Sequence, residues 1–165
     1  MASLAERLAG LALQPVVIVA CGTNARLLRE VRALGPATEG RVRALGFTHD
    51  VDLLLEAADV VVSKAGGLTC AEALIKRTPL VVFRPTPGQE VANVEYLERG
   101  GAALHAEDAD EVATTVGNWL ADPATRERVR EAEGRLARPR AAHAIAERVL
   151  AERAALVSGA VATEV

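Results

Sequence analysis

The residues best suited to chemistry stand in a glycine turn at positions 63–72, which read SKAGGLTCAE. Gly66 and Gly67 let a ligand approach the backbone closely, and a helix that starts there offers unpaired N–H groups and the positive end of its dipole. Such a turn binds a phosphate or a diphosphate, and Lys64 adds a positive charge. The spacing is not that of a P-loop. Thr69 and Glu72 have the spacing of a helix capping box, so a purely structural role for this carboxylate stays open.

A second polar group lies in the loop at positions 84–93, RPTPGQEVAN. Its prolines and glycine form a stiff turn that delivers Gln89, Glu90 and Asn93 to the start of a helix. Amide and carboxylate groups hydrogen-bond well to polyhydroxylated ligands. Helix capping and a solvated surface explain the same residues, so their spacing alone does not decide between the two interpretations.

Two further loops follow predicted strands. In GFTHD, at positions 46–50, free backbone groups at a strand end can pair with the edge of a planar base. His49 is an isolated histidine, for which capping or surface exposure is a more common role than catalysis. Gly22, Thr23 and Asn24 form a weak phosphate-type turn. The patterns G-x-S-x-G, H-E-x-x-H and G-x-G-x-x-G are absent from the sequence, which argues against several common enzyme classes, ordinary dinucleotide dehydrogenases among them.

The elements that must position these loops alternate in type along the chain. Apolar, β-branched segments predict strands at residues 15–21, 41–47, 59–63, 79–83 and 102–105. Amphipathic or alanine-rich segments predict helices at residues 3–13, 24–34, 50–57, 69–76, 89–98, 110–120, 123–137 and 141–154. This alternation is typical of a doubly wound, Rossmann-like parallel α/β sheet. Ligands bind such sheets at the carboxyl ends of the strands, where the polar loops fall.

Length and composition limit the function classes. The 165 residues suit one domain, the formal charge is −3 and aromatic residues make up 2% of the chain, so nucleic-acid binding is not expected. No window has the ~18 apolar residues that a membrane helix needs. Cys21 and Cys70 lie far apart in apolar surroundings, which fits buried free thiols in a reducing compartment. An export signal is disfavoured because the N-terminus lacks a net positive stretch, and a cytoplasmic protein is expected.

Taken together, the loops resemble the donor-binding domain of GT-B glycosyltransferases. Two segments carry the resemblance, VVIVACGTN and LGFTHDVDLLLEAADVVVSKAGGLTCAEALIKRTPLVVFRPTPGQEVANVEYLERGGAA. They are similar to the MurG and monogalactosyldiacylglycerol synthase group, glycosyltransferase family 28, and more to its diacylglycerol glucosyl- and galactosyltransferase branch than to MurG. The resemblance covers about residues 15–150. It implies that residues 1–155 form a UDP-sugar-binding domain, the C-terminal half of a GT-B fold, and that residues 156–165 form a flexible tail.

The resemblance implies roles for the residues on the nucleoside side of the donor. The backbone around Phe47 and Thr48 would meet the uracil edge of a UDP-sugar. Glu72 would accept hydrogen bonds from the ribose hydroxyls, which fits a carboxylate one turn into the helix. Gly22 and Asn24 would stand in the turn that flanks the donor pocket.

It also implies roles on the diphosphate and sugar side. The diphosphate would be held by the turn and the helix start, that is by Gly66, Gly67, Leu68 and Thr69. Lys64 and the backbone dipoles would offset the charge that builds up on the departing UDP. The sugar hydroxyls would meet Gln89, Glu90 and Asn93.

The implied reaction is inverting hexosyl transfer from a UDP-sugar to a lipid acceptor such as diacylglycerol, with no protein-bound metal and no cofactor beyond the donor. Family members bind the acceptor on an N-terminal domain, which also supplies the catalytic base. No such domain is recognised in this sequence. We therefore assign no catalytic residue and expect the chain to be inactive alone. An acceptor-binding domain or partner chain is implied, with peripheral association at the inner face of a membrane through it. A non-catalytic nucleotide-sugar-binding subunit and an inactive fragment remain as alternatives.

The family pattern also predicts a missing strand. The family's first strand and its glycine-rich turn should precede the helix at residues 3–13, where only Met1 and Ala2 stand. In the sheet order 3-2-1-4-5-6 that strand is central, and it separates the strands at residues 15–21 and 59–63. Those two strands either pair directly, or admit a strand from another chain, or belong to a truncated protein. Truncation is the favoured expectation.

Overall fold

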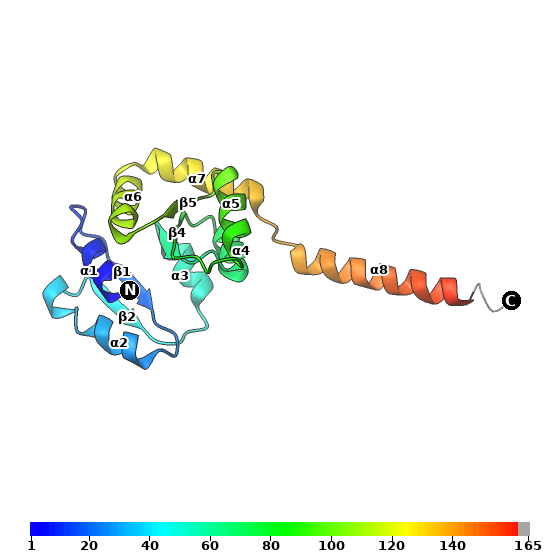
Figure 1. Ribbon diagram of the computed structural model, residues 1–165, viewed down its shortest axis with the longest axis horizontal. Helices are drawn as coiled ribbons and strands as arrows, with labels where there is room; N and C mark the ends of the chain where they lie inside the picture. Colours follow the sequence, from blue (N-terminus) through cyan, green and yellow to red (C-terminus); the bar gives the residue numbers. More distant parts are fainter. Residues whose placement is uncertain (162–165) are drawn as a thin grey trace.

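The computed structural model describes residues 1–161, with the side chains of residues 1–156, and its helices and strands alternate as the sequence predicts (Figure 1). The strands are β1 (Val17–Ala20), β2 (Val42–Leu45), β3 (Val61–Ser63), β4 (Leu80–Phe83) and β5 (Ala103–Ala106). The helices are α1 (Ala2–Ala9), α2 (Ala25–Arg32), α3 (Val51–Ala57), α4 (Gly67–Lys76), α5 (Val91–Arg99), α6 (Ala109–Ala121), α7 (Pro123–Leu136) and α8 (Ala141–Val161), with a 3₁₀ turn η1 (Pro36–Thr38).

All strand pairs in the described part of the chain are parallel, which confirms the predicted α/β class. The strands form two sheets, in the orders β1-β2 and β3-β4-β5. β1 and β2 pair in the register Val17–Val42 to Ala20–Leu45. Within residues 1–161 no backbone hydrogen bond joins β1 to β3. Direct pairing of these two strands, one of the three expected alternatives, is therefore wrong.

Helix α1 lies across the junction between the two sheets. Leu4 and Leu8 pack into the apolar cluster built around β4 and α6. Ala5 and Ala9, on the adjacent side of the helix, pack into the cluster built around β1, β2 and α2. One short helix therefore joins two cores whose strands share no backbone hydrogen bond in the described residues.

The three-stranded sheet is covered on both faces, as in a doubly wound fold. Side chains alternate along β4: Val81 and Phe83 face the cluster beneath α1 and α6, whereas Leu80 and Val82 face the cluster beneath α4, α5 and α7. All four are buried. This apolar run is the signature of a parallel strand with helices on both sides.

Strand β1 is less buried than β4, and among the described residues one of its edges carries no neighbouring strand. The N–H groups of Val17 and Cys21 donate toward β2, at 2.8 and 2.7 Å from the carbonyl oxygens of Arg41 and Leu45. Bonded residues alternate along a parallel strand, so the backbone groups of Ile18 face the opposite edge. The Ile18 residue is 51% exposed. Strand β1 therefore has an open edge and an exposed β-branched residue at its middle.

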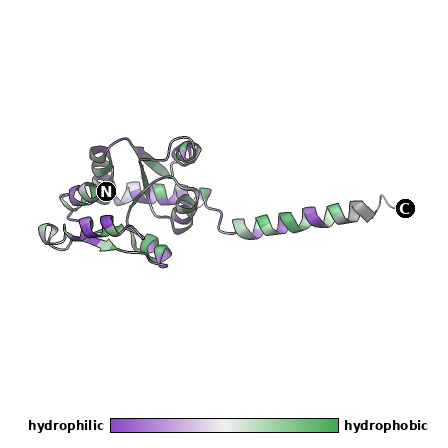
Figure 2. Cartoon of the chain, turned by 60° about the horizontal axis from the view of Figure 1, so that its bottom comes forward, coloured by the Kyte–Doolittle hydropathy of each residue, from purple (hydrophilic) through white to green (hydrophobic). Residues whose placement is uncertain are grey.

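Helix α8 extends away from the body of the molecule, and its side chains through residue 156 are exposed (Figure 1). Figure 2 shows apolar and polar residues interspersed along it. The helix was predicted to end at Ala154 but continues to Val161, so part of the predicted tail is helical. Positions 162–165 of that tail lie outside the described residues. No helix in the described chain is both long and apolar enough to cross a membrane.

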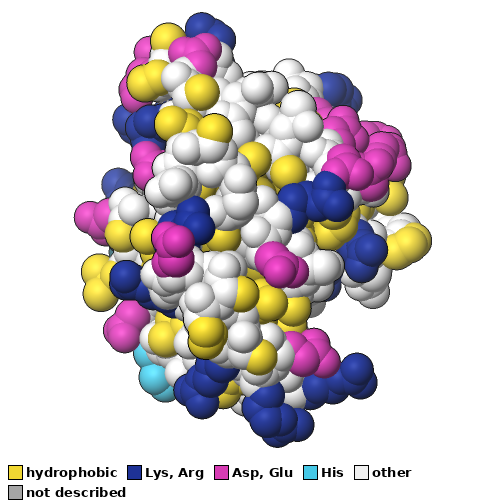
Figure 3. Space-filling model, turned by 90° about the vertical axis from the view of Figure 1, so that its left-hand side faces the viewer, with side chains coloured by type: hydrophobic (Ala, Val, Ile, Leu, Met, Phe, Trp, Pro, Cys, Tyr) yellow, Lys and Arg dark blue, Asp and Glu magenta, His cyan; other side chains and the backbone are white. Residues whose placement is uncertain are grey.

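The side of the molecule that carries α1 and α2 has a mixed surface charge. Figure 3 shows Lys and Arg side chains interspersed with Asp and Glu side chains over this face. Charges of opposite sign placed this close together offset each other at a distance, so this face presents no broad field of a single sign.

Candidate functional site

The glycine turn forms a helix start with unpaired backbone N–H groups. Gly66 is the N-cap of α4 at φ −66° and ψ 137°, and the first bond of the helix runs from the Cys70 N–H to the Gly66 carbonyl oxygen at 2.9 Å. The N–H groups of residues 66–69 have no acceptor, and no side chain caps this helix end, among the described residues. A Cβ atom placed on Gly67 would meet nothing within 4 Å. Unpaired N–H groups at an open helix start are suited to binding a phosphate.

The structure contradicts the capping-box interpretation of Thr69 and Glu72. A capping box needs its first residue in an extended conformation outside the helix, but Thr69 is already the third residue of α4 because the N-cap is Gly66. Glu72 is half-buried and makes neither a hydrogen bond nor an ion pair with any described residue. Its carboxylate lies about one turn beyond the unpaired N–H groups, where it can accept hydrogen bonds from ligand hydroxyls.

Lys64 and Glu90 face each other across the loops that follow β3 and β4. The Lys64 Nζ atom lies 3.5 Å from the Glu90 Oε1 atom and 3.4 Å from the Thr86 hydroxyl oxygen. The Glu90 Oε2 atom accepts the Thr86 backbone N–H at 2.6 Å. This hydrogen bond and the charge of Lys64 lower the pKa of Glu90, against the opposing effect of its burial. The Glu90 side chain is directed into the protein as the counter-ion of Lys64.

Asn93 and Gln89, from the same loop, point in different directions. The Asn93 Nδ2 atom donates to the Ala65 carbonyl oxygen at 2.8 Å, so this amide holds the residue that precedes the glycine pair. Gln89 is exposed. Of the polar residues predicted to meet the sugar, Gln89 is thus the one whose side chain is open to solvent, while Glu90 is buried and Asn93 half-buried.

The loop after β2 exposes an aromatic ring. Phe47 is 66% exposed and makes an edge-to-face contact with His49 at 4.9 Å between ring centroids. The Thr48 hydroxyl oxygen accepts the Asp50 N–H at 3.0 Å, which fixes the start of α3. Helix α3 in turn packs beside α4. The Phe47 ring is thus exposed at the end of β2, in the loop that leads into α3.

The turn after β1 caps helix α2. Gly22 adopts φ +54°, in the left-handed region that favours glycine. The Asn24 side-chain oxygen accepts the Leu27 N–H at 3.0 Å and caps α2. Hydrogen bonds join Lys64 to Glu90 and Ala65 to Asn93. Among the described residues no hydrogen bond or ion pair joins this group to Gly22 or Asn24, which follow a strand of the other sheet.

Two residues of this arrangement were not singled out from the sequence. Ala65 is fully buried and presents the carbonyl oxygen that Asn93 binds. Thr86 supplies the N–H and hydroxyl groups that meet Glu90 and Lys64. Thr86 stands between two prolines, which fixes its backbone and was the available signal. Nothing in the sequence around Ala65 marks its carbonyl group.

Cys21 and Cys70 are buried free thiols. Burial raises the pKa of both the Cys21 and the Cys70 thiols, and both cysteines are free, as predicted. Residues 1–161 contain no group of His, Cys, Asp and Glu side chains arranged to hold a metal ion.

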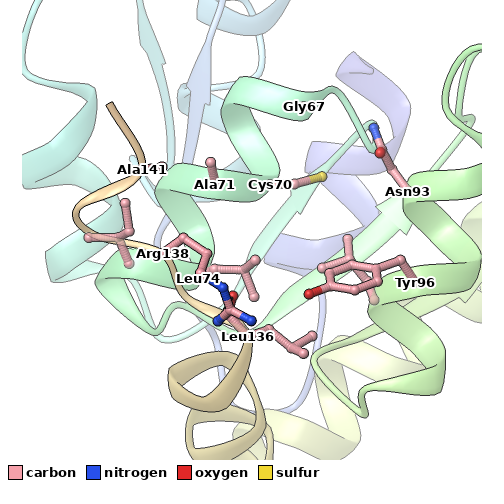
Figure 4. Close-up of a pocket in the computed structure, with 11 residues that line it drawn as sticks. Gly67, Cys70, Ala71, Leu74, Asn93, Tyr96, Leu136, Arg138 and Ala141 are labelled. Carbon is pink, nitrogen blue, oxygen red and sulfur yellow. Dashed lines mark hydrogen bonds between the residues drawn. The ribbon is translucent and has the colours of Figure 1, made fainter. Parts of the chain in front are cut away.

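A pocket of about 240 Å³ lies between α4, α5 and the segment that joins α7 to α8. Figure 4 shows Cys70 and Leu74 of α4 on one side of it and Tyr96 of α5 on the other. Its lining is mostly apolar, and it includes neither Glu72 nor Gln89. This pocket is therefore not the polar site that the sequence predicts, although Gly67 and Asn93 stand at its rim.

These features define a parallel α/β domain with an uncapped helix start at the carboxyl end of its sheet. The chain belongs to glycosyltransferase family 28, because the sequence model described as "Glycosyltransferase family 28 C-terminal domain" matches residues 3–149. The predicted resemblance is confirmed.

Curated relatives agree with this assignment. A processive diacylglycerol beta-glucosyltransferase of Bacillus cereus (strain AH187) is 32% identical over 136 residues, which are 82% of this chain and 35% of that protein. The Bacillus anthracis (strain CDC 684 / NRRL 3495) protein of the same name is 31% identical over the same shares. The chain spans about a third of the length of these relatives.

Solved structures confirm the fold. WaaG, described as a glycosyltransferase involved in lipopolysaccharide biosynthesis, matches 80% of this chain and 37% of its own at a TM-score of 0.62 and 19% identity. Anabaena Alr3699/HepE, solved in complex with UDP, matches 81% of this chain and 38% of its own at a TM-score of 0.62 and 21% identity. The Rossmann-like fold expected for the C-terminal half of a GT-B enzyme is thereby confirmed.

Proposed function

We propose that this domain binds the UDP part of a UDP-sugar donor at the glycine turn of α4. The observation that carries the proposal is the set of unpaired N–H groups at residues 66–69, which stands close to Lys64 and to the unpartnered carboxylate of Glu72. The N–H groups and the positive charge of Lys64 suit a diphosphate, and the Glu72 carboxylate suits the two hydroxyl groups of a ribose. The neighbour solved with UDP and the glucosyltransferase relatives support the choice of UDP-sugar over another phosphorylated ligand.

Each part of the donor has a proposed contact. The diphosphate binds the helix start, formed by Gly66, Gly67, Leu68 and Thr69, and the ribose binds Glu72. The uracil edge meets the backbone at Phe47 and Thr48, where the exposed ring is available for stacking. The sugar lies beside Gln89, which is exposed in the loop after β4. The turn with Gly22 and Asn24 flanks the pocket.

The proposed reaction is inverting hexosyl transfer to a lipid acceptor such as diacylglycerol, independent of metal and of any cofactor other than the donor. Unpaired N–H groups and Lys64 would stabilise the charge that develops on the departing UDP. We propose that the acceptor site and the base belong to an N-terminal domain or a partner chain at the cytoplasmic face of a membrane. The relatives named above support this, because most of their length lies outside the matched region.

Calorimetric titration tests the binding step. UDP, UDP-glucose, GDP and ADP are titrated into the 165-residue chain in buffer with EDTA, and UDP is repeated with Mg²⁺. We expect weak binding of UDP and UDP-glucose with EDTA present, and weaker binding of GDP and ADP. Binding of UDP only in the presence of Mg²⁺ would contradict the metal-independent proposal.

A transfer assay tests the division of labour. We expect no glucosyl transfer from UDP-glucose to diacylglycerol vesicles by the 165-residue chain alone, because the proposed base is elsewhere. Turnover by the pure chain would show that the base lies within these residues. UDP binding without turnover also fits a donor-binding subunit, and recovery of turnover on adding a candidate partner chain would identify that case.

A further inference from the structure

The α5 helix begins with a side chain that reaches back to the glycine turn. Asn93 is the third residue of α5, and its Nδ2 atom donates to the carbonyl oxygen of Ala65 at 2.8 Å, across 28 positions of sequence. Ala65 is fully buried, so its carbonyl oxygen is shielded from water. A buried carbonyl group without a partner is costly, and the Asn93 amide supplies that partner.

The residues after Ala65 need such a restraint. Gly66 and Gly67 lose more conformational freedom on ordering than any other residue type would. A Cβ atom on Gly67 would meet nothing within 4 Å, so packing does not confine that glycine. The turn is held instead at its two ends, by the first bond of α4 from Cys70 to Gly66 and by the Asn93 bond to Ala65.

The same geometry bears on the role that Asn93 was predicted to have toward the sugar. One N–H of its amide is committed to Ala65, and the side chain is half-buried. Gln89, four residues earlier, is exposed and available for sugar hydroxyls. The Asn93 bond to Ala65 should therefore affect the binding affinity of every ligand that carries the diphosphate, with or without a sugar.

We propose that Asn93 is a positioning residue for the diphosphate: by holding the Ala65 carbonyl group it keeps the N–H groups of residues 66–69 aimed at the ligand. The proposal rests on the proposed UDP site. It assigns to Asn93 an action through the backbone of the turn and not a direct contact with the donor sugar.

Three ligands separate the alternatives. Asn93→Ala removes the amide, and Asn93→Leu removes it at nearly constant volume without adding a charge that would repel phosphate. Uridine, UDP and UDP-glucose are titrated into each variant and followed by NMR chemical shifts. Loss of one neutral hydrogen bond predicts an affinity that is roughly three- to tenfold weaker for UDP and for UDP-glucose alike. Uridine affinity stays within about twofold, because uridine has no phosphate. Glu95→Gln, on the exposed side of α5, is the matched control and changes none of the three.

Each other result overturns the inference. A loss confined to UDP-glucose makes Asn93 a sugar ligand, an equal loss for uridine means a general structural defect, and an unchanged UDP affinity removes the positioning role. If the unaltered chain binds no UDP, the proposed function fails before any variant is compared. A second measurement needs no ligand: the amide order parameters of Gly66 and Gly67 should fall in Asn93→Ala and stay constant in Glu95→Gln. Unchanged order parameters would also overturn the inference.

Discussion

The Glu90 carboxylate accepts the backbone N–H of Thr86 at 2.6 Å, and the Glu90 N–H returns a bond to the Thr86 carbonyl oxygen at 3.1 Å. This reciprocal pair closes the loop between β4 and α5. Because the same carboxylate lies 3.5 Å from the Lys64 Nζ atom, the loop after β4 is tied to the loop after β3. The two loops predicted to bind the diphosphate and the sugar are thus held as one unit.

The Glu90 pair predicts a pH dependence of stability. Its pKa is lowered in the folded state by the Thr86 N–H and by Lys64. The stabilisation is therefore fully present above the unfolded pKa of about 4.3, and it is lost as the pH falls through the lower folded-state pKa. Below about pH 4.3 the free energy of unfolding should fall more steeply for the native chain than for Glu90→Gln. Urea unfolding at a series of pH values measures this, and parallel curves would contradict it.

Glu133 predicts the opposite slope. It is fully buried in α7, and neither carboxylate oxygen has a hydrogen-bond partner among the described residues. Burial raises the pKa of Glu133 to about 8, with Arg130 opposing. The free energy of unfolding is therefore unaffected by this group below the unfolded pKa of about 4.3. It falls as the pH rises from there toward 8, by at most roughly 1.4 kcal/mol per pH unit.

Replacement of Glu133 by leucine should therefore stabilise the protein at pH 7 and remove this slope. Urea unfolding between about pH 5 and pH 8 is the measurement. Glu131→Leu, at an exposed position of the same helix, is the matched control and should retain the slope of the native chain. A Glu133→Leu variant that is less stable than the native chain at pH 7 would show that the carboxylate has a partner of its own.

Glu72→Gln tests the ribose contact. Because Glu72 does not cap α4, the change should leave the melting temperature nearly constant. Loss of a charge-assisted hydrogen bond to the ribose should weaken UDP binding about tenfold to a hundredfold. Thermal melting and a UDP titration are the two measurements, with Glu131→Gln as the control. A lowered melting temperature with an unchanged dissociation constant would return Glu72 to a structural role.

The open edges of β1 and β3 predict that an added strand stabilises the fold. Ile18 faces the unpaired edge of β1, and α1 already spans both sheets. A five-residue Val- and Ile-rich segment, joined ahead of Met1 through a short glycine turn, would form a βαβ unit with α1 and β1, the right-handed connection that parallel sheets use. We expect a higher urea midpoint than for a Gly/Ser extension of the same length. Equal midpoints for the two extensions would show that the gap does not accept a strand.

Local sequence patterns predicted the elements well, because their signals lie within a few residues. Asp122 and Pro123 were predicted to start α7, and the Asp122 side chain does accept the N–H groups of Ala124 and Thr125. The apolar run of β4 likewise indicated a strand buried on both faces. Helix α4 begins at Gly67, two residues before the predicted range of 69–76, because the glycine pair itself forms the cap and the first turn.

The site was predictable only in part, because its contacts are long-range. The Lys64–Glu90 and Ala65–Asn93 contacts join positions 26 and 28 residues apart, which no local pattern reveals. The sequence identified Gly66, Gly67 and their neighbours correctly as a helix start with unpaired N–H groups. It could not tell which polar side chains of the second loop point outward, since that depends on how α5 docks against the first.

The most direct test of the account is the location of bound UDP by NMR. UDP is titrated into the ¹⁵N-labelled chain in the presence of EDTA, and the amide shifts are mapped. We predict the largest changes at residues 66–69, where the helix start has unpaired N–H groups, with further changes at Phe47 and Thr48. Changes centred instead on Leu74 and Tyr96 in the apolar pocket, or no changes at all, would contradict a UDP-sugar site at the glycine turn.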